Sequence, residues 1–224
     1  MNILVTGSNG LLGQAVSKMF IRETDHDIML TSAEDDSYVK DIHEYHTLDI
    51  TKKDDVKRIS SDFIPDVIVN CAITNVDLCE TERELSWKIN VDGVKNLIIA
   101  ARINNARAIH FSTDYVFDGK NGPYSEEDVP NPISFYGRKN LQARMHPKPV
   151  TLIIQSSGRL VLYGTGGKVK SNFVLWMIDK LKNNEPVNIV TDQISNVTMI
   201  EDLALGTMRI VDRGCSRHLQ YCWK

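Results

Sequence analysis

The chain has 224 residues, a net charge of -3 and a hydrophobic content of 42%, which suits a globular protein with one large core and a small additional lobe. Its charges are interspersed, and its apolar runs are far shorter than the roughly 18 residues that span a bilayer. The N-terminus lacks the charged segment of a secretory signal. We therefore expect a cytoplasmic protein that binds neither nucleic acid nor membrane.

Short apolar runs alternate with helix-length amphipathic stretches in the first half of the chain. We expect strands at 2–6, 27–31, 45–50, 66–70 and 106–112, and helices at 11–23, 52–62 and 78–103. Strands and helices that alternate in this way form a parallel sheet with right-handed crossovers and helices on both faces. The sequence thus predicts a doubly wound α/β fold of the Rossmann type.

The pattern loosens after residue 150. A strand at 151–154, a helix at 172–182, a strand at 187–190 and a helix from Glu201 are expected there. We divide the chain into a dinucleotide-binding domain at 1–150 and a partial, truncated substrate-binding lobe at 151–224. The indoles of Trp87 and Trp176 lie in apolar helical patterns, so core or interface positions are expected.

Cysteine and histidine do not form a metal-binding pattern. The four cysteines lack both the density of a disulfide scaffold and the paired C-x-x-C spacing of a zinc site; they are Cys71, Cys79, Cys215 and Cys222. His43 and His46 have no evident third ligand. We expect reduced thiols and no metal.

A glycine-rich turn follows the first predicted strand and leads into a helix. Gly7, Gly10 and Gly13 let backbone amides and a helix N-terminus approach a pyrophosphate and let the helix pack against the strand. The sequence therefore predicts dinucleotide binding. The second strand runs into "TSAEDD", where neither an acid nor an arginine stands unmistakably at the tip, so NAD and NADP both remain open.

Polar residues follow the fourth and fifth predicted strands. Asn70, Cys71 and Ala72 end one strand, and Ser112, Thr113 and Asp114 end the other. Because parallel strands place their carboxyl ends on one side, we expect both groups to meet the glycine turn in a ligand crevice. The turn-rich segment 114–132 is expected to cover that crevice as a loop.

Several motifs together resemble the extended short-chain dehydrogenase/reductases, and within them the sugar-nucleotide reductase branch that makes dTDP-rhamnose. The matching segments include "MNILVTGSNGLLGQAV", "PDVIVNCA", "KINVDGVKNLI", "STDYVFDG", "GPYSEEDVPNPISFYG" and "DQISNVTMIEDLA". The resemblance implies cofactor contacts at Gly7, Asn9, Gly10, Leu11, Leu12, Gly13, Asp49, Ile50, Asn70, Cys71, Ala72 and Asn90. It also implies substrate contacts at Asp114 and Tyr115 and catalytic hydroxyls at Thr113 and Tyr136.

The implied reaction is NADPH- or NADH-dependent reduction of a nucleotide-linked 4-keto-6-deoxy sugar, in which a tyrosine protonates the developing alkoxide. A homodimer is also expected. Two alternatives stay open. One is a non-catalytic dinucleotide-binding subunit resembling the regulatory subunit of methionine adenosyltransferase, and the other is a sugar-nucleotide epimerase.

The family's Tyr-x-x-x-Lys spacing is broken in this chain. Asn140 stands four residues after Tyr136, and Lys139 lies about 100° round the helix from that position. We expect Lys139 to be a solvated surface residue and turnover to be weak. The segments 139–160 and 214–224 also depart from the family's texture, and we interpret both as reading-frame slips. Restoring one base after Arg138 returns a lysine to the fourth position.

Overall fold

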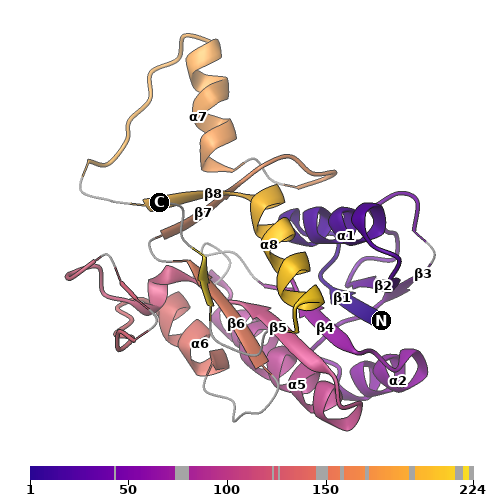
Figure 1. Cartoon of the computed structure of the whole chain (residues 1–224). Helices are drawn as coiled ribbons and strands as arrows, with labels where there is room; N and C mark the ends of the chain where they lie inside the picture. The colour runs from indigo at the N-terminus through magenta and orange to yellow at the C-terminus, as the bar shows by residue number, and fades with distance from the viewer. Residues whose placement is uncertain are drawn as a thin grey trace.

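A seven-stranded parallel sheet runs through the molecule (Figure 1), in the order β3-β2-β1-β4-β5-β6-β9. The computed structural model describes residues 1–42, 44–73, 81–122, 124–125, 127–144, 151–156, 159–169, 172–191, 195–214 and 219–221. The strands are β1 (Asn2–Thr6), β2 (Asp27–Ser32), β3 (Glu44–Thr47), β4 (Val67–Asn70), β5 (Arg107–Phe111), β6 (Thr151–Ser156) and β9 (Leu219–Tyr221). The order reverses between β1 and β4, where doubly wound folds bind ligands. The predicted fold class is confirmed.

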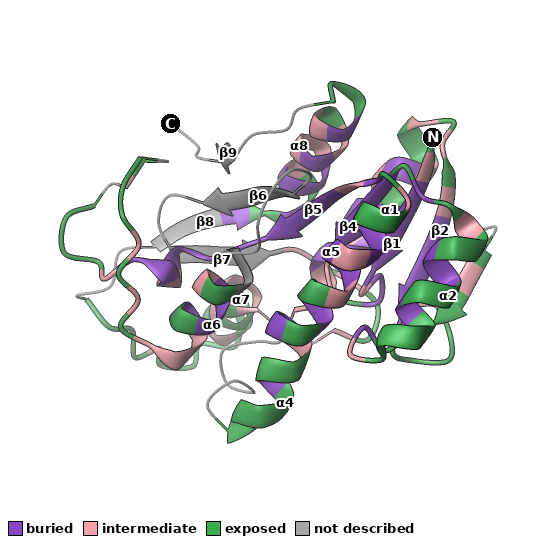
Figure 2. Ribbon diagram, turned by 90° about the horizontal axis from the view of Figure 1, so that it is seen from below, coloured by how far each residue is buried: buried purple, intermediate pink, exposed green. Residues whose placement is uncertain are grey.

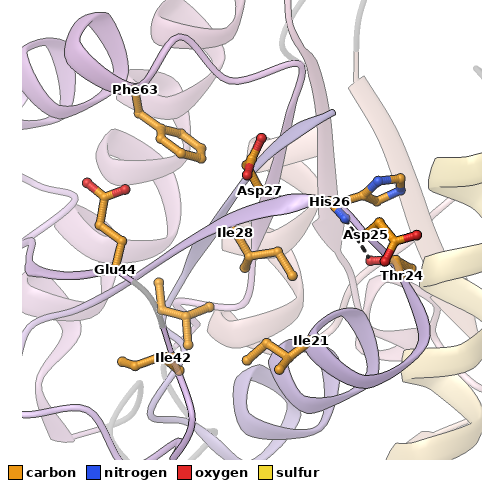
Figure 3. Close-up of a pocket in the computed structure, with 10 residues that line it drawn as sticks. Ile21, Thr24, Asp25, His26, Asp27, Ile28, Ile42, Glu44 and Phe63 are labelled. Carbon is orange, nitrogen blue, oxygen red and sulfur yellow. Dashed lines mark hydrogen bonds between the residues drawn. The ribbon is translucent and has the colours of Figure 1, made fainter.

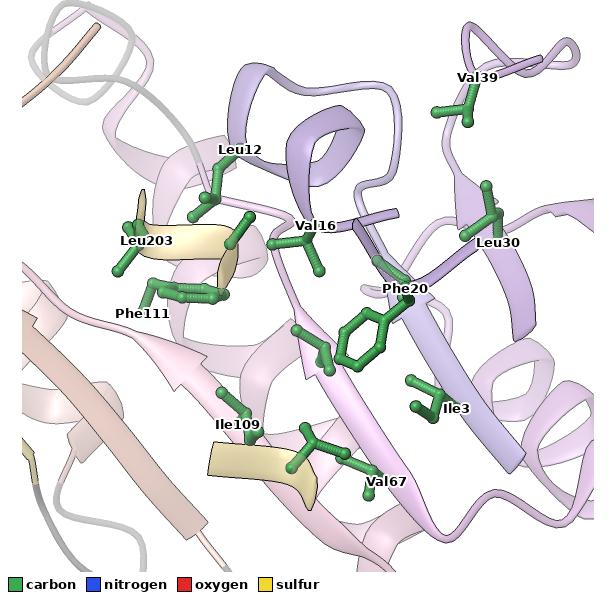
Figure 4. Packing of buried hydrophobic residues seen from close by; sticks show 14 residues of the cluster. Ile3, Leu12, Val16, Phe20, Leu30, Val39, Val67, Ile109, Phe111 and Leu203 are labelled. Atoms are coloured by element: carbon green, nitrogen blue, oxygen red, sulfur yellow. The ribbon is translucent and has the colours of Figure 1, made fainter. Parts of the chain in front are cut away.

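Helices cover both faces of the sheet. On one face lie α1 (Leu11–Glu23) and α8 (Ile200–Asp212), and on the other lie α2 (Lys53–Phe63) and α5 (Val94–Ile103). Alternate side chains of each strand point to opposite faces. Ile3 and Val5 join the core beneath α1 and α8 (Figure 4), whereas Leu4 joins the core beneath α2 and α5. Figure 2 shows the consequence, with buried central strands and helices exposed on their outer sides.

The helix expected at 78–103 is divided. The described part consists of α4 (Arg83–Trp87), a π-helical turn η1 (Lys88–Gly93) and α5. A Cβ on Gly93 would lie 2.7 Å from the side chain of Ile50, so a glycine lets the wide turn pack against the loop after β3. π-Helical turns are rare and often occur at functional sites.

The late part of the chain departs from expectation. A second parallel sheet pairs β7 (Arg159–Tyr163) with β8 (Ser195–Met199), and neither strand was predicted. The strand predicted at 187–190 is wrong, because those residues have no regular structure. β6 and β9 pair within the main sheet and α8 packs on α1. Among the described elements after residue 150, this leaves β7, β8 and α7 (Phe173–Lys182) outside the main sheet and its covering helices. The domain division at residue 150 stays a prediction.

Neither tryptophan singled out above is a core residue. Trp87 is 40% exposed and Trp176 is 37% exposed. Trp176 lies on α7, which projects from the body of the molecule (Figure 1) and has no buried residue.

Within the described part of the chain, no helix combines the length and apolarity needed to cross a bilayer.

Candidate functional site

The glycine turn after β1 is tightly folded against the neighbouring strands. Gly7 has φ +67°, and a Cβ there would lie 2.5 Å from the backbone nitrogen of Ala72. A Cβ on Gly13 would overlap the carbonyl oxygen of Gly7. Larger residues are therefore excluded from the two positions that bring the ends of β1 and β4 and the start of α1 together.

The N-terminus of α1 is open to an anion. Gly10 is the N-cap residue, no side chain caps the helix, and its first turn contains no acid. Leu12 is buried in the core and Leu11 is partly buried, so these residues offer backbone N–H groups rather than side chains. This arrangement fits a dinucleotide pyrophosphate, because free N–H groups and the helix dipole favour negative charge.

Asn70 ties the ends of three strands together. Its Oδ1 accepts hydrogen bonds from Thr6 Oγ1 at 2.8 Å and from the Ala72 backbone N–H at 3.0 Å, and its Nδ2 lies 3.1 Å from His110 Nδ1. The side chain of Asn70 is thus occupied with shaping the edge of the sheet. Burial raises the pKa of the neighbouring Cys71 thiol, which keeps it neutral at physiological pH.

The residues expected beside the adenine and along the cleft lie on the α2–α5 side. Asp49 Oδ1 accepts bonds from the Thr51 N–H and hydroxyl, so this carboxylate starts the turn into α2. Ile50 is buried, and its carbonyl accepts from Asn96 Nδ2 at 2.9 Å. Asn90 is buried within the π-helical turn η1. The glycine turn and Asn70 therefore lie at the switch point of the sheet, and η1 packs against α5 and α6 on the same side as Ile50.

The expected catalytic hydroxyls are brought into one neighbourhood. Thr113 is buried and caps the short helix η2 (Asp114–Val116), where its Oγ1 accepts from the Tyr115 N–H and donates to Asp114 Oδ1 at 3.1 Å. Tyr115 packs edge-on against Tyr136 of helix α6 (Phe135–Arg144), with ring centres 5.3 Å apart. Gly137 permits this approach, since a Cβ there would overlap the carbonyl oxygen of Tyr115.

Lys139 is fully buried, so the prediction of a solvated lysine is wrong. Its Nζ donates to Ser86 Oγ at 2.9 Å and lies 5.5 Å from the centre of the Tyr136 ring. Asn140 is also buried, and its Nδ2 donates to the carbonyl of Tyr136 at 2.9 Å. The residue at the family's lysine position therefore bonds its own helix, while the lysine three residues after Tyr136 faces the tyrosine.

The loop between η2 and α6 is organised around Asp118. Its carboxylate accepts bonds from the Lys120 N–H, from the Tyr124 hydroxyl at 2.8 Å and from Asn131 Nδ2 at 3.0 Å. These bonds, the Lys120 backbone bond first among them, lower the pKa of Asp118. Phe117 and Tyr124 stack with ring centres 4.2 Å apart. The described residues of this loop are thus joined by hydrogen bonds and ring stacking, and its role as a cover over the crevice stays a prediction.

A pocket of about 460 Å3 lies away from this region (Figure 3). Its lining includes His26, Ile28, Glu44 and Phe63, around the amino end of β2. The glycine turn and the catalytic candidates lie at the carboxyl ends of the strands, so this pocket is not part of the candidate site.

Among the described residues no three His, Cys, Asp or Glu side chains are grouped to hold a metal, and His46 bonds Glu44 instead. His43 and the cysteines at 79, 215 and 222 lie outside the described residues.

Two contacts at the glycine turn were not foreseen. The buried side chain of Gln14 donates to the carbonyls of Asn9 and Gly167 and accepts from the Gly167 N–H, each at 2.8 Å. Glu34 reaches back from the tip of β2 to Asn9. The Gln14 contact has no signal in the local sequence, and the sequence analysis singled out no acid of "TSAEDD", so neither contact was predicted.

Comparison with known families agrees with this geometry. The model of the RmlD substrate binding domain matches residues 1–222. The chain belongs to this family. It is 32% identical over 216 residues to the dTDP-4-dehydrorhamnose reductase of Aggregatibacter actinomycetemcomitans, covering 94% of this chain and 67% of that protein. RmlD family membership confirms the resemblance inferred from the motifs.

Two further relatives bear on the alternatives. Methionine adenosyltransferase 2 subunit beta of Bos taurus is 32% identical over 213 residues, which is 94% of this chain and 62% of that protein. The structure of dTDP-4-dehydrorhamnose reductase from Bacillus anthracis, in complex with NADP, superimposes with a TM-score of 0.81 at 29% identity. That comparison covers 100% of this chain and 74% of the other. The chain thus spans between about three fifths and three quarters of these relatives.

Proposed function

We propose that the chain reduces a nucleotide-linked 4-keto-6-deoxy sugar with NADPH or NADH, as dTDP-4-dehydrorhamnose reductases do. The observation that carries this proposal is the buried Lys139 ammonium facing Tyr136, whose ring packs against Tyr115, the residue whose N–H bonds Thr113. A regulatory subunit that only binds a dinucleotide has no need of a buried cation at a tyrosine. Burial of an ammonium is costly unless the site uses or compensates the charge.

In the proposed mechanism each residue of the site has a separate role. A nicotinamide cofactor would, when bound, supply the hydride for the sugar C4. The glycine turn and the start of α1 would hold its pyrophosphate. Thr113 Oγ1, already fixed by Asp114 and the Tyr115 N–H, orients the ketone oxygen. The Tyr136 phenol donates its proton to that oxygen, giving an alcohol and a phenolate. Lys139 stabilises the negative charge that develops on Tyr136.

The remaining assignments are part of the same proposal. Residues 1–150 would bind the cofactor and 151–224 would contribute to the substrate lobe, with the cofactor and substrate contacts expected from the resemblance. A cytoplasmic location and a homodimer are also proposed, and light scattering of the purified chain tests the dimer. The interpretation of 139–160 and 214–224 as reading-frame slips is tested by resequencing the coding DNA across both segments.

The test of function is cofactor oxidation by the purified chain with dTDP-4-dehydrorhamnose. We expect turnover that Tyr136→Phe lowers by about 100-fold or more while leaving cofactor affinity unchanged, since general acid catalysis contributes about 10²–10⁴-fold. Cofactor binding without oxidation of any nucleotide 4-keto sugar would refute the reductase. It would favour the non-catalytic alternative, which Asn140 and the similarity to the methionine adenosyltransferase subunit support. An isomerised sugar without net cofactor oxidation would indicate an epimerase.

A further inference from the structure

We propose that Ser86 is a positioning residue for the reduction, because its hydroxyl holds the Lys139 ammonium where it faces Tyr136. This inference rests on the proposed reductase function and deepens it. It explains how a lysine one residue out of the family's spacing serves the same tyrosine.

The direction of the Lys139 side chain is the first argument. Residues three and four positions after Tyr136 lie about 100° apart around the helix axis, one on each side of the tyrosine. Asn140 takes one side and bonds the Tyr136 carbonyl of its own helix. Lys139 takes the other side, and its Nζ donates to Ser86 on α4, 53 residues earlier in the chain. The ammonium is therefore anchored outside α6.

The second argument is burial. Ser86 and Lys139 are both 0% exposed, and the distance from Lys139 Nζ to Ser86 Oγ is 2.9 Å. An ammonium carries three donors, and a buried donor that loses its acceptor is costly. Because the Ser86 hydroxyl is neutral, it holds the ammonium without cancelling its positive charge, as a carboxylate at residue 86 would. The charge stays available to Tyr136, whose ring centre lies 5.5 Å from Nζ.

The third argument is the helical segment that carries Ser86. Ser86 belongs to α4, which runs directly into η1, and η1 packs against α6. Asn90, expected beside the cofactor, is buried in η1 four residues after Ser86. The π-helical form of η1 is itself typical of functional sites. One segment thus carries both a cofactor candidate and the anchor of the lysine.

The first experiment measures the Lys139 ammonium in the full chain without cofactor. In nuclear magnetic resonance spectra of the chain with isotope-labelled lysine, Lys139→Met identifies the signal of this ammonium. We expect Ser86→Ala to speed exchange of its protons with water by about 10-fold or more, the factor that corresponds to a hydrogen bond with a charged group. Unchanged exchange in Ser86→Ala would overturn the inference.

Ser60→Ala is the matched control for both experiments. Ser60 is also a buried serine on a helix, but it lies on α2 and its hydroxyl donates to the Lys57 carbonyl of the same helix. Its replacement should change the exchange rate of the ammonium and the kcat of the enzyme by less than about 3-fold.

The second experiment is steady-state reduction of dTDP-4-dehydrorhamnose. Ser86→Ala should lower kcat by about 10-fold and leave KM unchanged, since the lysine acts on charge that develops only in the transition state. In a chain that already carries Lys139→Met, the same substitution should change kcat by less than about 3-fold, because Ser86 acts through the lysine.

The kinetic outcomes separate a positioning role from a structural one. An equal loss of kcat with and without Lys139 would show that Ser86 shapes the fold of α4 and η1 instead, and it would overturn the inference. An unchanged kcat in Ser86→Ala would do the same. Failure of the unsubstituted chain to oxidise the cofactor would overturn the proposed function and the catalytic part of this inference together, while the exchange rates would still decide whether Ser86 holds the lysine.

Discussion

Replacement of Lys139 by methionine tests the site most directly. At 5.5 Å, the separation of Lys139 Nζ from the centre of the Tyr136 ring, two unit charges interact by about 3 kcal/mol at an effective dielectric constant of about 20. If the ammonium stabilises the phenolate that forms in the transition state, its loss should lower kcat by about 100-fold. KM should stay unchanged, since the interaction is made only in the transition state.

Stability separates this effect from simple damage to the fold. Methionine keeps the length of the buried chain and removes an ammonium whose burial is costly, but it also removes the donor to the buried Ser86 hydroxyl. These effects oppose each other, so the free energy of unfolding should fall by no more than about 1–3 kcal/mol. Steady-state kinetics with the keto sugar and urea denaturation of the same preparations measure both quantities. Arg138→Met, an exposed neighbour on α6, is the control and should change kcat by less than about 3-fold. Lys139→Met with more than about a third of the original kcat would refute the catalytic role of the lysine.

Three further predictions concern the glycine turn and its surroundings. Gly13→Ala should destabilise the fold by about 1–3 kcal/mol and weaken cofactor binding, because its Cβ would overlap a carbonyl oxygen; Gly122→Ala, with its nearest contact at 3.6 Å, should be nearly neutral in thermal denaturation. Asn70→Ala should cost about 1–3 kcal/mol in urea denaturation, since it leaves buried polar groups unpaired, and an unchanged midpoint would show that they find other partners. The hydrogen bond from Ser32 lowers the pKa of Glu34. Ser32→Ala should therefore reduce the free energy of unfolding by its full amount above pH 4.5, the ordinary pKa of this carboxyl group. The reduction should disappear as the pH falls through the pKa that Glu34 has in the folded protein. A constant difference between the two proteins down to acid pH would contradict that linkage.

Local patterns predicted the first half of the fold well. The helix expected at 11–23 matches α1 in full. The two signals that predicted it are local: the spacing of its apolar residues and the glycine turn directly before it. The burial of Lys139 could not be read in this way. Its partner, Ser86, is 53 residues away, and helical spacing alone places a residue relative to its own helix rather than to the helix packed against it.

The errors in the late chain have a related cause. The run at 187–190 contains β-branched apolar residues, and such residues favour strands when they pack on a neighbouring strand. In the structure these residues have no such pairing, and the more polar segment β8 pairs with β7 instead. The choice between the two segments is made by tertiary contacts that no window of sequence contains.

Gln14 has a consequence for how the protein matures. Its amide closes the glycine turn onto Gly167, more than 150 residues later in the chain. During synthesis the first strand, turn and helix leave the ribosome long before that partner exists, and domains fold as their residues become available. The glycine turn therefore gains one of its contacts only after a late-synthesised segment is made. A nascent chain truncated before Gly167 would contain every glycine of the motif and still lack the contacts between Gln14 and Gly167.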